Sequence, residues 1–133
     1  MREIKYIVLH CTATSKDATV ENIKKYWKER LGWKNVGYHF IIKPNGKIEK
    51  LAGIDTITNG VRGFNDRSIH ISYIGGKYED DRTEDQIESQ HFIVGILKDM
   101  FPKAKIQGHT DFPKVTKSCP RFDAIEEFKY LDK

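Results

Sequence analysis

Hydrophobic residues along the chain follow two different periods, one typical of strands and one typical of helices. Residues 4–11 carry apolar and β-branched side chains on both faces, which indicates an interior strand that is covered on both sides. Residues 19–30 place apolar side chains every three or four positions. This spacing predicts an amphipathic helix that is capped by Thr19 and ended by Gly32.

A hairpin and a further strand are predicted in the middle of the chain. Residues 36–42 and 47–51 are apolar segments that flank an Asn-Gly pair at residues 45–46, and such a pair is typical of a tight β-turn. After a polar loop that is rich in glycine, residues 68–74 return to a strand pattern, which Gly75 ends.

The longest predicted helix opens with a capping box, formed by Thr83 and Gln86, and ends before a proline. Its expected buried face consists of Ile93, Ile96, Leu97 and Met100. Residues 105–108 predict a short strand, and Asp123 opens a last helix toward Tyr130. This alternation predicts an α/β fold, a single mixed β-sheet with helices packed on it.

Composition limits the class of protein. The length of 133 residues and the hydrophobic share of 38% fit a single domain over residues 1–133, which can bury a core without disulfides. No apolar run approaches the roughly 20 residues of a membrane-spanning helix, so we expect no membrane span. A monomer is also expected. The net charge of +4 is mild, and lysines alternate with acids, so no specific nucleic-acid partner is expected.

Three residues of the kinds that bind zinc stand at the ends of predicted strands or in the loops beyond them. His10 closes the first strand, His109 follows the strand of residues 105–108, and Cys119 lies in a proline-flanked loop. An α/β sheet places its chemistry at such positions. Three nitrogen and sulfur ligands leave one position of a tetrahedral zinc ion open, as in catalytic sites. The spacing alone also allows a buried core histidine and an inert thiol.

Four ordered blocks resemble the type 2 N-acetylmuramoyl-L-alanine amidase family, which shares a superfamily with the peptidoglycan recognition proteins. The blocks are residues 7–14 (IVLHCTAT), 37–42 (GYHFII), 65–76 (NDRSIHISYIGG), and 108–111 (GHTD) together with 117–120 (KSCP). They cover nearly the whole chain, and they are similar to the small, phage-type members that use a cysteine ligand.

The resemblance implies a zinc-dependent hydrolase that cleaves the amide bond between N-acetylmuramic acid and L-alanine in peptidoglycan. Its zinc ligands would be His10, His109 and Cys119, with Tyr38 and Lys117 as the catalytic pair. Peptidoglycan or muropeptides are then the expected partners. No secretory signal is visible, so we expect an endolysin of phage or prophage type that stays in the cytoplasm until it is released to the cell wall.

The residues themselves support these roles and leave alternatives open. Tyr38 and His39 face opposite sides of the predicted strand, and the resemblance selects Tyr38 for the site, where its hydroxyl can orient water or transfer a proton. A core tyrosine is the alternative. Lys117 lies two residues before Cys119, so in an extended segment its ammonium projects to the same side and can stabilise an oxyanion. A surface lysine is the alternative.

One loop departs from the family pattern. Where many relatives carry a Gly-Ala-His segment beside the substrate groove, residues 58–60 read Thr-Asn-Gly, so the histidine is missing. Asn59 is the polar replacement. Its side-chain amide donates and accepts hydrogen bonds, so we expect it to bind substrate.

The remaining candidates are expected to lie outside the site or behind it. Cys11 should point to the opposite face of its strand as a buried thiol without a role in the site. His39, His70 and His91 are expected to be structural or, for the last two, exposed to solvent. Asp111 is expected to orient an imidazole.

Two functions of other classes are also compatible with the sequence. One is a recognition module that binds muropeptide without cleaving it, as superfamily members without the cysteine ligand are thought to do. The other is a zinc-stabilised regulator that binds a protein partner. The presence of Cys119 together with Tyr38 and Lys117 favours the enzyme.

Overall fold

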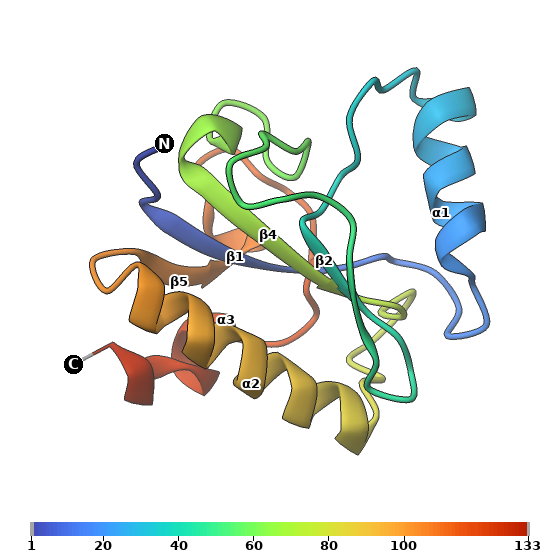
Figure 1. The fold of residues 1–133 in the computed structure, drawn as a ribbon. Coiled ribbons are helices and arrows are strands. Elements are labelled where there is room, and N and C mark those ends of the chain that lie inside the picture. Colours follow the sequence, from blue (N-terminus) through green and yellow to red (C-terminus); the bar gives the residue numbers. More distant parts are fainter. Residues whose placement is uncertain (1, 133) are drawn as a thin grey trace.

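The computed structural model describes residues 2–132, and one five-stranded sheet forms its centre (Figure 1). The strands are β1 (Tyr6–Cys11), β2 (Phe40–Ile42), β3 (Ile48–Lys50), β4 (Ser68–Tyr73) and β5 (Lys105–Gly108). Their order is β3-β2-β4-β1-β5, and every neighbouring pair is parallel except β2 with β3. The predicted mixed sheet is therefore confirmed, with β1 as an interior strand.

Helices cover both faces of this sheet. They are α1 (Val20–Lys25), α2 (Glu84–Met100) and α3 (Ala124–Glu127). Val94 and Leu97 of α2 share a buried cluster with Ile42, whereas Trp27 shares another with Ile41. Adjacent strand residues point to opposite faces, so α2 and the segment that follows α1 lie on opposite sides of β2. This burial on both sides explains the nearly continuous apolar character of the inner strands.

The hairpin is shorter than predicted, because β2 begins at Phe40 and not at residue 36. Two contacts hold the preceding residues away from a regular strand. The backbone N–H of Asn59 donates to the carbonyl oxygen of Val36 at 3.0 Å, and a Cβ atom on Gly37 would lie 2.9 Å from the Trp27 ring. Val36 and Gly37 therefore pack against a loop and an indole ring, whereas His39 already donates its backbone N–H to the carbonyl oxygen of His70 on β4 at 2.9 Å.

The rotation of α2 about its axis also differs from the prediction. Its predicted capping box is present, but the buried residues are Gln86, Gln90, Ile93, Val94 and Leu97. Ile96 and Met100, predicted to be buried, are 41% and 50% exposed. The Gln86 side-chain amide donates to the carbonyl oxygens of Ile42 and Ile74 at 3.2 and 3.1 Å. These bonds to the sheet orient the helix and place Ile96 and Met100 outside.

The other two helices are less regular than predicted. Thr19 caps α1 as expected, and the helix continues as a π-helical turn over Tyr26–Arg30. Gly32 then ends it with a φ of 66°, a conformation that favours glycine. Asp123 caps α3, but a separate 3₁₀ turn, Lys129–Leu131, follows, so the expected single helix is two short elements.

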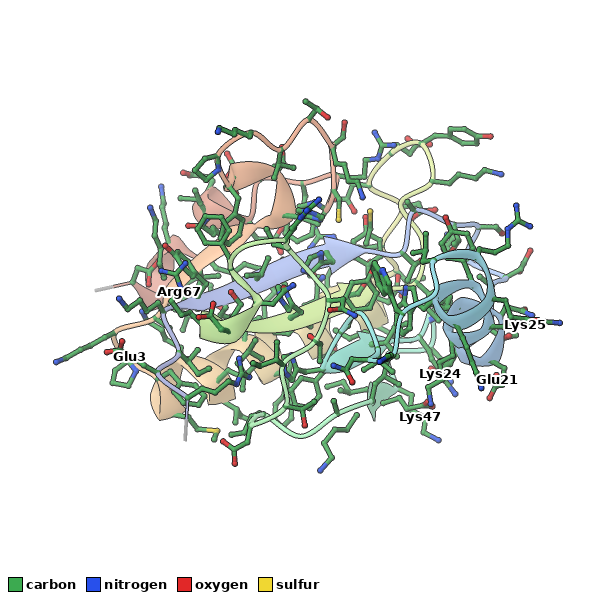
Figure 2. All side chains as sticks on the ribbon, turned by 90° about the horizontal axis from the view of Figure 1, so that it is seen from above. Glu3, Glu21, Lys24, Lys25, Lys47 and Arg67 are labelled. Atoms are coloured by element: carbon green, nitrogen blue, oxygen red, sulfur yellow. The ribbon has the colours of Figure 1, made fainter. Side chains whose placement is uncertain are left out.

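Charged side chains of both signs share the surface of the molecule. Figure 2 shows Glu21 beside Lys24 and Lys25 on α1, with Glu3 and Arg67 at the opposite end. The positive and negative side chains on α1 therefore offset each other's charge locally.

Within residues 2–132, no helix has both the length and the apolar character that a membrane crossing requires.

Candidate metal centre

The parallel strands end at one edge of the sheet, and two of the predicted ligands lie there. His10 is the penultimate residue of β1, and His109 directly follows β5. These strands pair in parallel, with Leu9 opposite Gly108. Strand pairing thereby brings two imidazoles that are far apart in sequence to a ring-centroid distance of 4.9 Å. The edge is where an α/β sheet collects functional groups.

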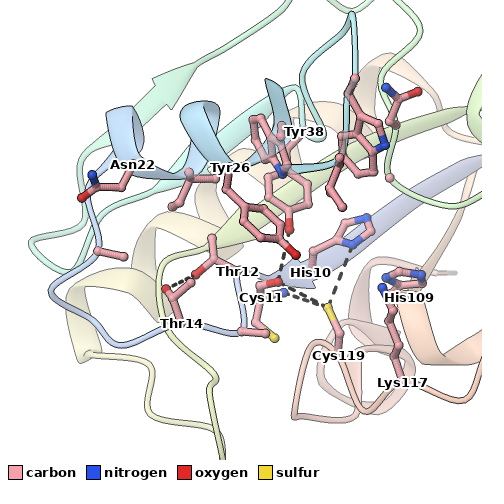
Figure 3. Close-up of a pocket in the computed structure, with 18 residues that line it drawn as sticks. His10, Cys11, Thr12, Thr14, Asn22, Tyr26, Tyr38, His109, Lys117 and Cys119 are labelled. Carbon is pink, nitrogen blue, oxygen red and sulfur yellow. Dashed lines mark hydrogen bonds between the residues drawn. The ribbon is translucent and has the colours of Figure 1, made fainter. Parts of the chain in front are cut away.

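Cys119 completes the group from the loop that follows β5 (Figure 3). Its Sγ lies 4.0 Å from His10 Nδ1, and the ligand atoms of Cys119, His10 and His109 all lie within 4.8 Å of one another. Donors around a tetrahedral zinc ion are about 3.3–3.8 Å apart, given bonds of about 2.0–2.3 Å. Small side-chain rotations are enough to close this difference, so the donor set fits zinc.

The Cys119 thiol also contacts the end of β1. The backbone N–H of Cys11 donates to Cys119 Sγ at 2.9 Å. The Cys11 side chain is buried among the core residues of the opposite face, as predicted, but the expectation that Cys11 has no role in the site is wrong. Contact with the Cys11 thiol and burial raise the pKa of Cys119 above its ordinary value.

The two histidines of this group are held as neutral imidazoles, which is the form that can bind a metal ion. Burial lowers the pKa of His10 well below its ordinary value, and burial together with the charge of Lys117 lowers the pKa of His109 to about 4. His70, predicted to be structural or exposed, is fully buried on β4. Its Nδ1 lies 2.8 Å from His10 Nε2, so it contacts a candidate ligand from behind.

Tyr38 lies beside the ligands, although it precedes β2 and is not part of a strand. Its ring centroid is 5.0 Å from that of His10, and its hydroxyl donates to the carbonyl oxygen of Cys11 at 3.2 Å. His39 is buried elsewhere, against Thr58. Burial raises the pKa of the Tyr38 phenol above its ordinary value, so the hydroxyl stays protonated and acts as a hydrogen-bond donor at neutral pH.

Lys117 faces the same cavity as Cys119, in agreement with their spacing in the sequence. This cavity has a volume of about 650 Å³, and Figure 3 shows Lys117 next to His109 at its rim. The Lys117 charge lowers the pKa of both His10 and His109, so the ammonium lies near these two candidate ligands.

An aromatic wall of the cavity was missed in the sequence. It includes Tyr26, Trp27 and Trp33, and the rings of Trp27 and Trp33 are stacked with centroids 6.2 Å apart. Trp27 fitted the apolar stripe of a helix, so nothing in its local spacing pointed to the site. Three large aromatic residues within eight positions, just before Gly37 and Tyr38, were the available signal.

Asn59 lies where this cavity meets a second one, whose volume is about 860 Å³. Trp33, Asn59, Gly60, His109 and Lys117 line both. The Asn59 side-chain amide donates to the carbonyl oxygen of Asn35 at 3.2 Å, so it also joins two loops. The residue is therefore placed beside the candidate metal centre, as a substrate-binding group must be.

Two further predictions have different outcomes. The Asp111 carboxylate accepts a hydrogen bond from the backbone N–H of Gly108 at 2.8 Å. It caps the turn that carries His109, and its role in orienting an imidazole stays a prediction. His91 is structural, as predicted. Its ring nitrogens lie 2.6 Å from the Tyr130 hydroxyl and 2.9 Å from the Glu127 carboxylate.

Comparison with known proteins agrees with this geometry. Residues 1–122 match the model of the N-acetylmuramoyl-L-alanine amidase family. The endolysin of Enterobacteria phage K11 is 33% identical over 129 residues, which are 92% of this chain and 83% of that protein. The solved amidase LysCS of Clostridium intestinale has a TM-score of 0.84 at 26% identity, covering 97% and 83% of the two chains. Bumblebee PGRP-SA has the same fold, with a TM-score of 0.81 at 22% identity and coverage of 97% and 82%.

Fold and site thus define a hydrolase that acts on peptidoglycan. The chain belongs to the N-acetylmuramoyl-L-alanine amidase family. Both the predicted family and the predicted amidase activity are confirmed, and peptidoglycan cleavage is favoured over the recognition module.

Proposed function

We propose that this amidase is zinc-dependent and that His10, His109 and Cys119 are its metal ligands. The observation that carries the proposal is the convergence of these three donors within 4.8 Å at one end of a cavity. When bound, zinc supplies a Lewis acid that polarises the scissile carbonyl and lowers the pKa of water. The open fourth position is what a catalytic zinc site requires.

The catalytic pair proposed here is Tyr38 and Lys117. In the reaction, a water oxygen bonds to the lactyl carbonyl carbon, the bond to the L-alanine nitrogen breaks, and that nitrogen takes up a proton. The Lys117 ammonium stabilises the negative charge that develops on the carbonyl oxygen. The Tyr38 phenol, held as a donor by its raised pKa, orients an oxygen of water or substrate.

The test is digestion of purified peptidoglycan by the purified protein with and without a chelator, followed by mass spectrometry of the released ends. Cleavage at the proposed bond yields stem peptides with a free L-alanine amine and glycan chains with intact lactyl groups. The chelator should stop the reaction, and added zinc should restore it. Activity that persists after complete zinc removal would reject the zinc proposal, while release of sugar or inner-peptide ends would reject the bond assignment.

We also propose that the protein is an endolysin that accumulates in the cytoplasm as a monomer until it reaches the cell wall. The similarity to the phage K11 endolysin supports this. Cell fractionation before and after membrane permeabilisation tests the location, and light scattering on a sizing column tests the monomer. Wall digestion while the membrane is still intact would contradict the proposed release.

A further inference from the structure

A second histidine stands directly behind the candidate ligand His10. His70 is fully buried on β4, and its Nδ1 lies 2.8 Å from His10 Nε2. The other ring nitrogen, Nε2, lies 2.9 Å from the Asn65 side-chain oxygen. Three polar side chains thus form one line that runs from the metal centre into the protein.

The direction of every hydrogen bond in this line follows from one backbone group. The backbone N–H of Val61 donates to the Asn65 side chain at 2.7 Å. The accepting atom must therefore be the side-chain oxygen of Asn65 and not its amide nitrogen. Facing that oxygen, His70 Nε2 must carry a proton and donate. His70 Nδ1 is then unprotonated and acts as an acceptor. His10 Nε2 must therefore carry a proton and donate it to His70 Nδ1 in a hydrogen bond.

The consequence for His10 is a single tautomer. With its proton on Nε2, His10 leaves Nδ1 with a free lone pair, and this is the nitrogen that lies 4.0 Å from Cys119 Sγ. The reverse tautomer would place two acceptors, His70 Nε2 and the Asn65 oxygen, face to face in a buried site, which is unfavourable.

The loop beside His70 leaves space for this ring and for nothing more. A Cβ atom on Gly60 would lie 2.3 Å from His70 Nδ1 and 2.4 Å from two ring carbons. Glycine at position 60 is therefore required by the histidine on β4.

We propose that His70, oriented by Asn65, is a positioning residue that fixes His10 in the tautomer whose Nδ1 is free to bind zinc. The inference rests on the proposed zinc function of His10. A partner behind a metal-binding histidine fixes its tautomer and ring orientation, and its loss costs about 10–100-fold in metal affinity.

The first test measures the tautomer in the absence of metal. Long-range proton–nitrogen NMR spectra of the metal-free protein should show His10 with its proton on Nε2, assigned with a His10→Asn variant. In His70→Leu, this single state should be replaced by a mixture of tautomers. A wild-type His10 with its proton on Nδ1 would overturn the inference whatever the zinc affinity.

The second test measures zinc affinity by competition with a chelating dye. His70→Gln retains an acceptor and should bind zinc within about threefold of the wild type, whereas His70→Leu should bind about 10–100-fold more weakly. Equal affinity in both would overturn the positioning role. A wild type that binds no zinc would instead reject the proposed function, so the two failures are distinguishable.

A steric control separates chemistry from packing. Gly60→Ala should displace the His70 ring and weaken zinc binding without altering any polar group. Adding His70→Ala to Gly60→Ala removes the collision, so thermal stability should recover in the double variant while zinc affinity stays low. Recovery of wild-type zinc affinity in that double variant would show that His70 only fills space.

Discussion

At the scale of single residues, burial decides which protonation states the site can use. It keeps His10 and His109 neutral and Tyr38 protonated, because each charged form would lose its hydration. The one residue that must change state is Cys119, whose thiol has a raised pKa in the metal-free protein. Zinc binding should therefore release a proton from this thiol.

We predict that Cys119→Ser loses most of its zinc, with affinity reduced by more than about 100-fold, because the thiolate is the one anionic ligand. Cys11→Ser is the matched control, since it keeps the backbone N–H that contacts Sγ. It should keep zinc but lose about 1–3 kcal/mol of stability from a buried hydroxyl. Elemental analysis and chemical denaturation measure both effects. Full zinc in Cys119→Ser would contradict the ligand assignment.

For the catalytic pair, Tyr38→Phe and Lys117→Ala should each slow hydrolysis by about 10²-fold or more while zinc content and fold are retained. Each variant removes a donor or a charge beside the metal and leaves the three ligands intact. Lys103→Ala, an exposed lysine before β5, should keep normal turnover. Peptidoglycan turnover and zinc content are the measurements. Near-normal rates in both site variants would show that the pair is misassigned.

At the scale of elements, the site is made by strand ends and by the loops that join them. The parallel pairing of β1 with β5 brings His10 close to His109. The loop around Asn59 then forms the boundary between the two cavities. Its backbone and side chain are tied to residues 35 and 36, so this loop is held in place.

Asn59→Ala should raise KM for a muropeptide several-fold and leave zinc content unchanged. Loss of its hydrogen bond to the Asn35 carbonyl should lower stability by about 0.5–1.5 kcal/mol. Asn35→Ala is the control, because it keeps the carbonyl that accepts this bond. Enzyme kinetics and thermal denaturation separate the two contributions. An unchanged KM would remove Asn59 from the substrate site, and a large loss of stability would assign it a structural role.

At the scale of the whole molecule, the proposed metal would link parts of the chain that are distant in sequence. His10 and Cys119 are separated by 109 positions, and the metal would join the first strand to the C-terminal loop. A ligand that binds the folded state alone stabilises it by about 2.7 kcal/mol at 100 times its Kd. Zinc should therefore stabilise the fold as well as supply chemistry.

Removal of zinc with a chelator should lower the melting temperature by about 10 °C relative to protein with excess zinc. Calcium should fail to restore it, because calcium prefers oxygen ligands. The measurement is calorimetry of the two forms, with Cys119→Ser as the control, whose melting temperature should respond little to zinc. An equal response in that variant would place the stabilising metal elsewhere.

The sequence by itself predicted most of the strands and helices and the family to which the chemistry belongs. The capping box of α2, the end of β1 and the turn before β3 are local patterns that lie within a few residues. The proposed ligand set of His10, His109 and Cys119 was implied by the resemblance of the short motifs around these residues to the amidase family. The tertiary structure brings these three residues together as that set requires.

Only the tertiary structure decided how these elements face one another. The exposed positions of Ile96 and Met100 depend on two hydrogen bonds from Gln86 to the sheet. The contact between His10 and His70 joins residues 60 positions apart, and the collision that makes Gly60 necessary exists only in the folded chain. Local periodicity cannot encode such contacts, because they depend on strand pairing and on the space that each neighbouring side chain leaves.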